Sequence, residues 1–291
     1  NSDDSAHSIT SPLLVQRFAP GLQAAGEEEQ PAELFSNILV PVTDAKAQEH
    51  LLALASLLTR AGSGRVMVVS VAKSAGATES SFVFHREQLS RVPEIMGDPS
   101  TDVELIPRLA ASHAEGILHT ALERRASLIL MGWRGRRTLQ QSVLGTVLDE
   151  VIWGSDTPVM VGKLNYPLNG IQRVLLILPP KALAPQVMRR ILEANLALAK
   201  ALNVPLTIHT DLEYAQQMEA LLARRETGQP VEIEAAKGPL NVHKLEKDNL
   251  SDLIVVPGFG PRQRFLSGVG YLPERLAASF SGNLIILHFD K

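Results

Sequence analysis

The chain has 291 residues, of which 45% are hydrophobic and 20% are charged, and its formal net charge at pH 7 is −3. This composition is typical of a globular protein, and the length suffices for two ordinary domains. Because the net charge is small, we expect no general attraction to nucleic acid or to an anionic membrane. The absence of cysteine excludes disulfides and thiolate metal ligands. No apolar run approaches the ~18 residues of a membrane-spanning helix.

Residues 1–34 differ from the rest of the chain, and we interpret them as a tether. They are polar at first, then carry a short apolar patch, and continue with Pro, Gly and acidic residues. We expect one or two helical turns around residues 12–18. The chain begins with Asn1 rather than Met, and no apolar segment typical of a signal peptide follows, so we expect a fragment or a processed product.

From residue 35 onwards, short apolar runs alternate with amphipathic segments. The apolar runs predict buried strands at residues 38–43, 66–72, 103–109, 128–131 and 159–162. The amphipathic segments predict helices at residues 48–60, 86–95, 114–125 and 147–153. Pro107 falls in the third strand and places it at a sheet edge, because proline cannot donate to a central ladder. Alternating strands and helices predict a parallel sheet that is covered on both faces.

The same order of elements then repeats. Strands are expected at residues 173–178, 206–209, 231–235, 253–256 and 284–289, and helices at residues 186–202, 214–225, 241–249 and 273–280. A shift of 125 residues lays the fourth strand of the first half over that of the second. We interpret this as a tandem duplication. The expected organisation is a tether at 1–34, a domain at 35–163, a linker at 164–172 and a second domain at 173–291.

A glycine-rich loop follows the strand at 128–131. Its key positions are Gly132, Gly135, Gly145 and Thr146, and an apolar-periodic segment comes next. Glycine lets backbone N–H groups approach a ligand closely, and the free N–H groups of a helix's first turn favour anions. The loop is therefore a candidate phosphate site, and the alternative is a purely structural strand-to-helix turn. The spacing is neither that of a Walker loop nor that of a Rossmann fingerprint.

The corresponding loop of the second half is altered. At the 125-residue offset, Pro257 replaces Gly132 and Tyr271 replaces Thr146. Proline has no N–H to offer, and the phenol would crowd a phosphate at the helix start. We expect one competent loop and one degenerate loop in each chain.

The spacing Gly-x2-Gly-x9-Gly-Thr resembles the nucleotide loop of the universal stress protein family. Residues 36–163 resemble a full domain of that family, and the second half resembles a more diverged copy. The resemblance implies an α/β fold: two tandem, open, five-stranded parallel sheets of Rossmann-like type that form an intrachain pseudo-dimer. The last strands, at residues 158–162 and 284–288, would pair. The nucleotide would lie between the carboxyl ends of strands one and four, which is also the topological switch point where open α/β sheets bind ligands.

The resemblance also implies the site residues. The base and ribose would contact the end of strand one and nearby backbone, and the loop would hold the phosphates. The candidate nucleotide-binding residues are Pro41, Val42, Thr43, Asp44, Val71, Met131, Gly132, Arg134, Gly135, Ser142, Gly145 and Thr146. ATP-binding family members usually carry Asp directly after the first strand, where this chain has Thr43, with Asp44 one residue later. For Ser142, an exposed loop serine is an equal alternative to a phosphate contact.

The sequence shows no catalytic set. It has no Walker lysine, no acidic strand-end partner for magnesium and no Gly-x-Ser-x-Gly elbow. No His-x3-His pair indicates zinc, and Asp44 is a single carboxylate beside the predicted phosphates. We therefore predict no catalytic residue and no metal site formed by the protein alone, although Mg²⁺ could accompany ATP.

The leading hypothesis is a regulatory module that binds an adenine nucleotide: ATP, ADP, AMP or a cyclic derivative. Similar tandem copies occur as cytoplasmic C-terminal regions of bacterial monovalent cation/proton antiporters. The resemblance thus implies a membrane transport domain in the same full-length chain, a location at the cytoplasmic face of the inner membrane, and a homodimer. The alternatives are a slow ATPase and a ligand-free scaffold for dimerisation or interaction.

Overall fold

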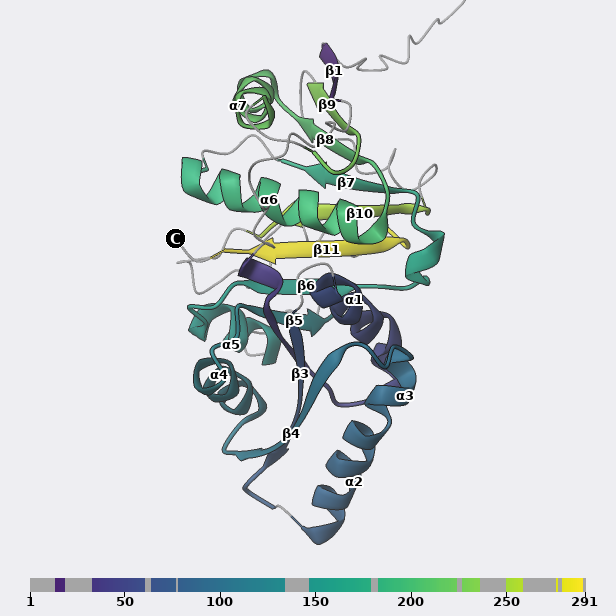
Figure 1. Ribbon diagram of the computed structural model, residues 1–291. Helices are drawn as coiled ribbons and strands as arrows, with labels where there is room; N and C mark the ends of the chain where they lie inside the picture. The colour runs from purple at the N-terminus through teal and green to yellow at the C-terminus, as the bar shows by residue number, and fades with distance from the viewer. Residues whose placement is uncertain are drawn as a thin grey trace, which may run out of the picture.

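The computed structural model describes residues 14–18, 33–60, 64–76, 78–133, 147–178, 183–223, 227–235, 250–258, 276 and 279–289. The first half contributes strands β2 (Asn37–Pro41), β3 (Arg65–Lys73), β4 (Asp102–Ala110), β5 (Leu128–Gly132) and β6 (Val159–Lys163). The second half contributes β7 (Arg173–Ile177), β8 (Leu206–Thr210), β9 (Val231–Ala235), β10 (Asp252–Pro257) and β11 (Asn283–His288). With β1 (Leu14–Phe18), they form one sheet in the order β1-β9-β8-β7-β10-β11-β6-β5-β2-β3-β4 (Figure 1).

Each half has the same strand order. In the first half, β2 pairs in parallel with β5 on one side and with β3 on the other. In the second half, β7 pairs in the same way with β10 and β8. The strand order therefore reverses direction beside β2 and beside β7, which confirms the predicted fold class. The strand with Pro107, β4, lies at an outer edge of the sheet, as the sequence predicts.

The two halves join through their last strands. β6 and β11 pair antiparallel, with Lys163 opposite Leu284 and Val159 opposite His288. This confirms the expected intrachain pseudo-dimer. The Asn283 side chain fastens the following linker, since its Oδ1 accepts from the backbone N–H groups of Asn165 and Tyr166 at 2.9 and 3.0 Å.

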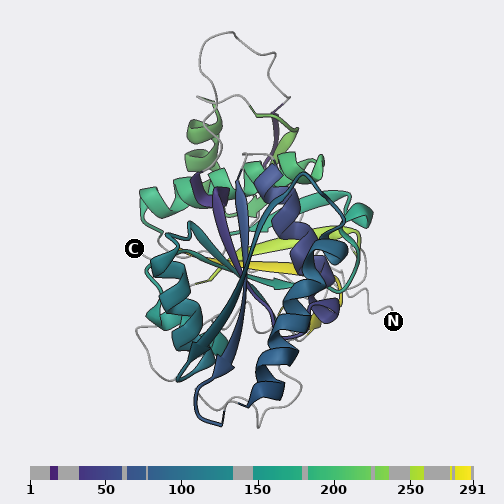
Figure 2. The same ribbon diagram turned by 60° about the horizontal axis from the view of Figure 1, so that its bottom comes forward.

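Helices cover both faces of the sheet (Figures 1 and 2). One face carries α1 (Glu49–Arg60), α3 (Val92–Met96), α6 (Pro185–Leu202) and α7 (Leu212–Leu222), and the other carries α4 (His113–Glu123) and α5 (Val147–Gly154). Strand side chains alternate between the faces, so Ile38 and Val40 pack beside α1 while Leu39 joins the α4 side. α1 also contacts α6 across the join. One core layer therefore runs through both halves.

The expected helical turns around residues 12–18 are wrong. Leu14–Phe18 is strand β1, which pairs antiparallel with β9 and closes the outer edge of the second half (Figure 1). Phe18 packs against the core, and Arg17 reaches Glu232 at 3.3 Å. An unpaired edge strand exposes a row of backbone donors and acceptors, and this pairing satisfies them on β9.

The helix expected at 86–95 is two helices. α2 (Glu79–Ser90) begins earlier, because Thr78 and Ser81 form a reciprocal capping box. α3 follows with Pro93 in its first turn, where a missing N–H costs nothing. The helix expected at 241–249 and most of that at 273–280 lie outside the described residues.

Candidate functional site

The candidate site is the switch point at the carboxyl ends of β2 and β5. These strands are parallel neighbours, with Ile38 opposite Leu128 and Leu39 opposite Ile129. Their neighbours on the outer sides are β3 and β6, so the chain leaves the two strand ends in opposite directions along the sheet. Open α/β sheets bind ligands in the crevice that this reversal creates.

The structure brings part of the predicted set to this place. Pro41 ends β2, and the buried Val42 and the exposed Thr43 and Asp44 follow it. Met131 and Gly132 end β5 directly beside β2. The remaining candidates Arg134, Gly135, Ser142, Gly145 and Thr146 lie outside the described residues.

Val71 lies near the end of β3 and has a packing role. A Cβ built on Gly116 of α4 would stand 2.5 Å from a Val71 methyl group. Glycine at 116 therefore lets α4 approach β3 closely, and Val71 fills the contact.

The loop after β2 is held by Gln48, the last residue of the short 3-10 helix η2 (Lys46–Gln48). Gln48 Oε1 accepts from the backbone N–H groups of Thr43 at 3.0 Å and Asp44 at 3.4 Å. Its Nε2 donates to the Pro41 carbonyl oxygen at 3.0 Å. The same Nε2 lies 3.6 Å from the position that a Cβ on Gly132 would take. Gln48 thus stands between the two strand ends.

A second glutamine fixes the same loop from α2. Gln88 is buried, and its Oε1 accepts from the backbone N–H of Ala45 at 3.0 Å. One turn earlier on α2, His85 Nδ1 lies 2.7 Å from the hydroxyl of Ser70 on β3. Burial lowers the pKa of His85, and the nearby His113 lowers it further, so a neutral imidazole is favoured in this contact.

Asp44 has a structural role in the loop. Its Oδ1 accepts from the backbone N–H of Ala47 at 3.0 Å and so ties the loop to η2. One carboxylate oxygen is therefore committed to the protein. Among the described residues, no cluster of three or more His, Asp or Glu side chains is placed to hold a metal ion.

Sequence reasoning did not find Gln48 and Gln88 as parts of the site. Gln48 was visible only as the first residue of a predicted helix, and a glutamine there is ordinary. Gln88 meets Ala45 across 43 residues of sequence, and no local pattern reports such a contact.

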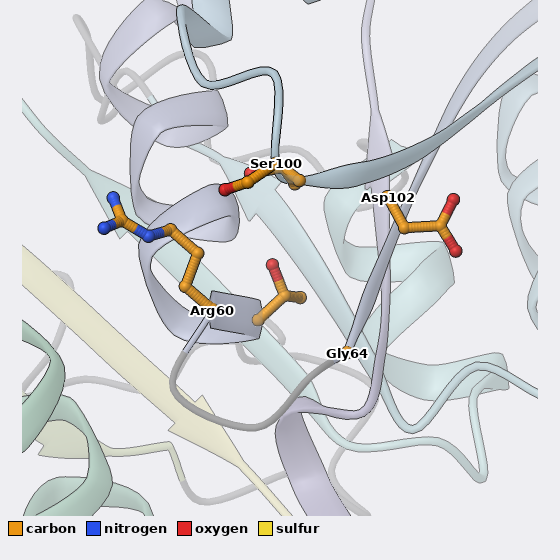
Figure 3. A pocket seen from close by; sticks show the side chains of 6 residues that line it. Arg60, Gly64, Ser100 and Asp102 are labelled. Carbon is orange, nitrogen blue, oxygen red and sulfur yellow. The ribbon is translucent and has the colours of Figure 1, made fainter.

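A pocket of about 400 Å³ lies at the opposite end of the first half (Figure 3). It is formed at the amino ends of β3 and β4 and the end of α1. Arg60 pairs with Asp98 at 3.3 Å and Arg65 with Asp102 at 2.8 Å, so the charges there are already matched. Figure 3 also shows the side chains of Arg60 and Asp102 pointing to opposite sides rather than toward a common ligand. We therefore favour the switch point as the functional site.

The fold and the site define a tandem α/β protein with a ligand-binding type of strand reversal in each half. Residues 34–163 match the model of the Universal stress protein family. The first half of the chain thus matches a universal stress protein domain, and the second half repeats its strand order.

Known proteins match over nearly the whole chain. The Na(+)/H(+) antiporter NhaS5 of Synechocystis sp. is 26% identical over 322 residues, which cover 96% of this chain and 45% of that protein. The chain thus spans less than half the length of this relative. Among the described residues, no helix combines the length and apolar character needed to cross a membrane.

Two solved structures show the same fold over both halves. A universal stress protein from Archaeoglobus fulgidus superposes with a TM-score of 0.65 at 17% identity, covering 87% of this chain and 96% of that one. The cytoplasmic domain of a prokaryotic cation chloride cotransporter superposes with a TM-score of 0.60 at 15% identity, covering 87% of this chain and 95% of that one.

Proposed function

We propose that this chain is a regulatory module that binds an adenine nucleotide in its first half and controls an attached cation/proton antiporter. The observation that carries the proposal is that β2 and β5 end side by side in the half that matches the universal stress protein family, and that the glycine positions follow β5 in the sequence. The antiporter relative, which matches across both halves, supports the link to transport. The module would lie at the cytoplasmic face of the membrane, and the similar cotransporter structure is itself a cytoplasmic domain.

The ligand would be ATP, ADP, AMP or a cyclic adenine nucleotide, with Mg²⁺ accompanying ATP. Pro41, Val42, Thr43 and Asp44 would lie beside the base and ribose, with Val71 and Met131 behind them. The phosphates would lie on the loop that begins at Gly132, through Arg134, Gly135, Ser142, Gly145 and Thr146. We assign the module no catalytic residue.

The domain boundaries follow from the same proposal. The tether would comprise residues 1–34, the nucleotide-binding domain 35–163, the linker 164–172 and the partner domain 173–291. Two such chains would form a homodimer. Control of transport requires that the nucleotide bind one state of the antiporter more tightly than the other, since a ligand with equal affinity for both shifts nothing.

The test is a binding screen of the purified chain by calorimetry and thermal shift. The ligands are ATP, ADP, AMP, cyclic AMP and cyclic di-AMP, with and without magnesium. A ligand at about 100 times its Kd stabilises the folded state by about 2.7 kcal/mol. We expect one site per chain. Gly145→Trp should abolish binding, and the matched variant Gly270→Trp in the degenerate loop should preserve it.

One alternative has a specific observation in its favour. In the loop after β2, glutamines already accept from the backbone donors and Asp44 already accepts from Ala47, as expected of a scaffold that binds no ligand. Absence of binding by every nucleotide, or equal binding by both tryptophan variants, would overturn the proposed nucleotide site and favour the scaffold.

A further inference from the structure

The loop after β2 has few donors left for a ligand. The backbone N–H of Val42 donates to Val69 at 2.8 Å. Those of Thr43 and Asp44 donate to Gln48, and that of Ala45 to Gln88. A base that lies against this loop therefore meets no free backbone N–H at residues 42–45.

Gln48 supplies the missing donor. Its carboxamide nitrogen carries two hydrogens, and the Pro41 carbonyl takes one. The second has no partner among the described residues. Its oxygen already accepts twice, from Thr43 and Asp44. The side chain thus presents a donor and no spare strong acceptor to a ligand. The exposed Thr43 hydroxyl is the other donor at this strand end.

The orientation of this amide follows from its surroundings. Exchanging its oxygen and nitrogen would set an oxygen against the Pro41 carbonyl and an amide N–H group against two backbone N–H groups, so the hydrogen-bond network selects the observed orientation. Three hydrogen bonds hold the group before any ligand arrives. A donor that is already ordered loses little entropy on binding.

We propose that Gln48 is the residue that selects the base at the switch point, by donating from Nε2 to a ring nitrogen of adenine. The inference rests on the proposed function and adds to it a named specificity residue. The half-buried, neutral carboxamide suits a neutral base better than a phosphate, and it is bonded to the end of β2. Gln48 would donate a hydrogen bond to an acceptor nitrogen of the purine, whereas a carboxylate at the strand end would accept one from the amino group.

The experiment compares adenosine with its 1-deaza, 3-deaza and 7-deaza analogues, each of which replaces one ring nitrogen by a C–H group. Adenosine is the probe because it carries no phosphate, so a new charge on the protein does not repel it. In the wild-type chain, one analogue should bind about 10-fold more weakly than adenosine, as expected for the loss of one hydrogen bond. In Gln48→Glu, the affinity for adenosine should fall by a similar factor. The same analogue should then bind this variant as tightly as adenosine does.

Gln48→Glu is chosen because the carboxylate keeps both acceptor contacts and removes the amide donor; it also sets an oxygen against the Pro41 carbonyl, so its folding is measured separately. Gln186→Glu is the matched control, since it makes the same change at an exposed position of α6 in the second half, away from the switch point. It should leave the ratio of adenosine to deaza affinities at the wild-type value. Thermal unfolding of the ligand-free variants reports whether the loop still folds.

Two failures are distinguishable. If the wild-type chain binds no adenine nucleotide, the proposed function fails and the role of Gln48 fails with it. If the wild-type chain binds ATP, and binds adenosine and all three deaza analogues with equal affinity, the nucleotide site is supported and Gln48 does not select the base. The wild-type series gives this answer even if Gln48→Glu does not fold. An unchanged deaza penalty in Gln48→Glu also overturns the assignment.

Discussion

His288 makes the folding stability of this chain sensitive to mild acid. It lies on β11 with 7% of its surface exposed, and its Nε2 has no hydrogen-bond partner among the described residues. The imidazole packs against the backbone of Gly258, where a Cβ would collide with it. Burial lowers the pKa of His288 from 6.5 to about 4. Protonation would place an unpaired charge inside the sheet, so the folded state disfavours it.

The sign and size of the effect follow from this difference in pKa. Between pH 6.5 and about 4, the unfolded chain binds a proton at this position and the folded chain does not. The stability contribution is therefore complete above pH 6.5 and is lost as the pH falls through this window. A full difference of about 2.5 pH units corresponds to about 3 kcal/mol, of which about 2.5 kcal/mol should be lost by pH 4.5.

Urea unfolding at pH 7.5, 5.5 and 4.5 measures this loss in the wild type and in His288→Leu. Protonation of carboxylates with lowered pKa values, such as Glu123 and Glu234, also destabilises the folded state in acid, but to the same extent in both proteins. The wild type should lose about 2–3 kcal/mol more than the variant between pH 7.5 and 4.5. Parallel stability curves for the two proteins would refute the reasoning.

Two further predictions concern packing and the tether. Gly116→Ala should lower the free energy of unfolding in urea by about 1–3 kcal/mol, because its Cβ would meet a Val71 methyl at 2.5 Å. Gly170→Ala is the control and should be close to neutral, because nothing lies within 4 Å of a Cβ there. Equal losses in the two variants would contradict the packing role. Deleting residues 1–18 removes β1 and uncovers the β9 edge, so light scattering should show concentration-dependent self-association. Arg17→Ala should leave the chain unchanged because Arg17 is 82% exposed, and self-association in this variant would point to charge rather than edge pairing.

The sequence predicts the strand order well because each strand carries its own local signal. Continuous apolar runs mark buried parallel strands, and the repeat shows that the second half follows the first. Pro107 identifies the edge strand β4 because proline lacks the donor that a central strand needs. The pairing of β6 with β11 followed from the family resemblance rather than from any property of those strands alone.

Long-range contacts set the limit of such predictions. The segment Leu14–Phe18 is short enough to suit a helical turn or a strand, and its partner Val231–Ala235 lies more than 200 residues away. The free edge of β9 decides the outcome, and only the assembled sheet reveals that edge. The same holds for Gln88, which fixes Ala45 through a tertiary contact. Of the candidate site, the sequence therefore locates the strand ends but not the side chains that shape the loop between them.

The halves have diverged at corresponding places, and this has a consequence for regulation. In the first half, Gln88 of α2 accepts a hydrogen bond from the loop after β2. In the second half, the Tyr214 hydroxyl of the corresponding helix α7 accepts from the backbone N–H of Leu183 after β7. β5 ends on Gly132, whereas β10 ends on Pro257. A ligand site confined to the first half would make the pseudo-dimer asymmetric in its bound state. The β6–β11 pairing and the contact between α1 and α6 are the physical connections between the proposed ligand site and the second half, whose outer edge at β9 pairs with β1.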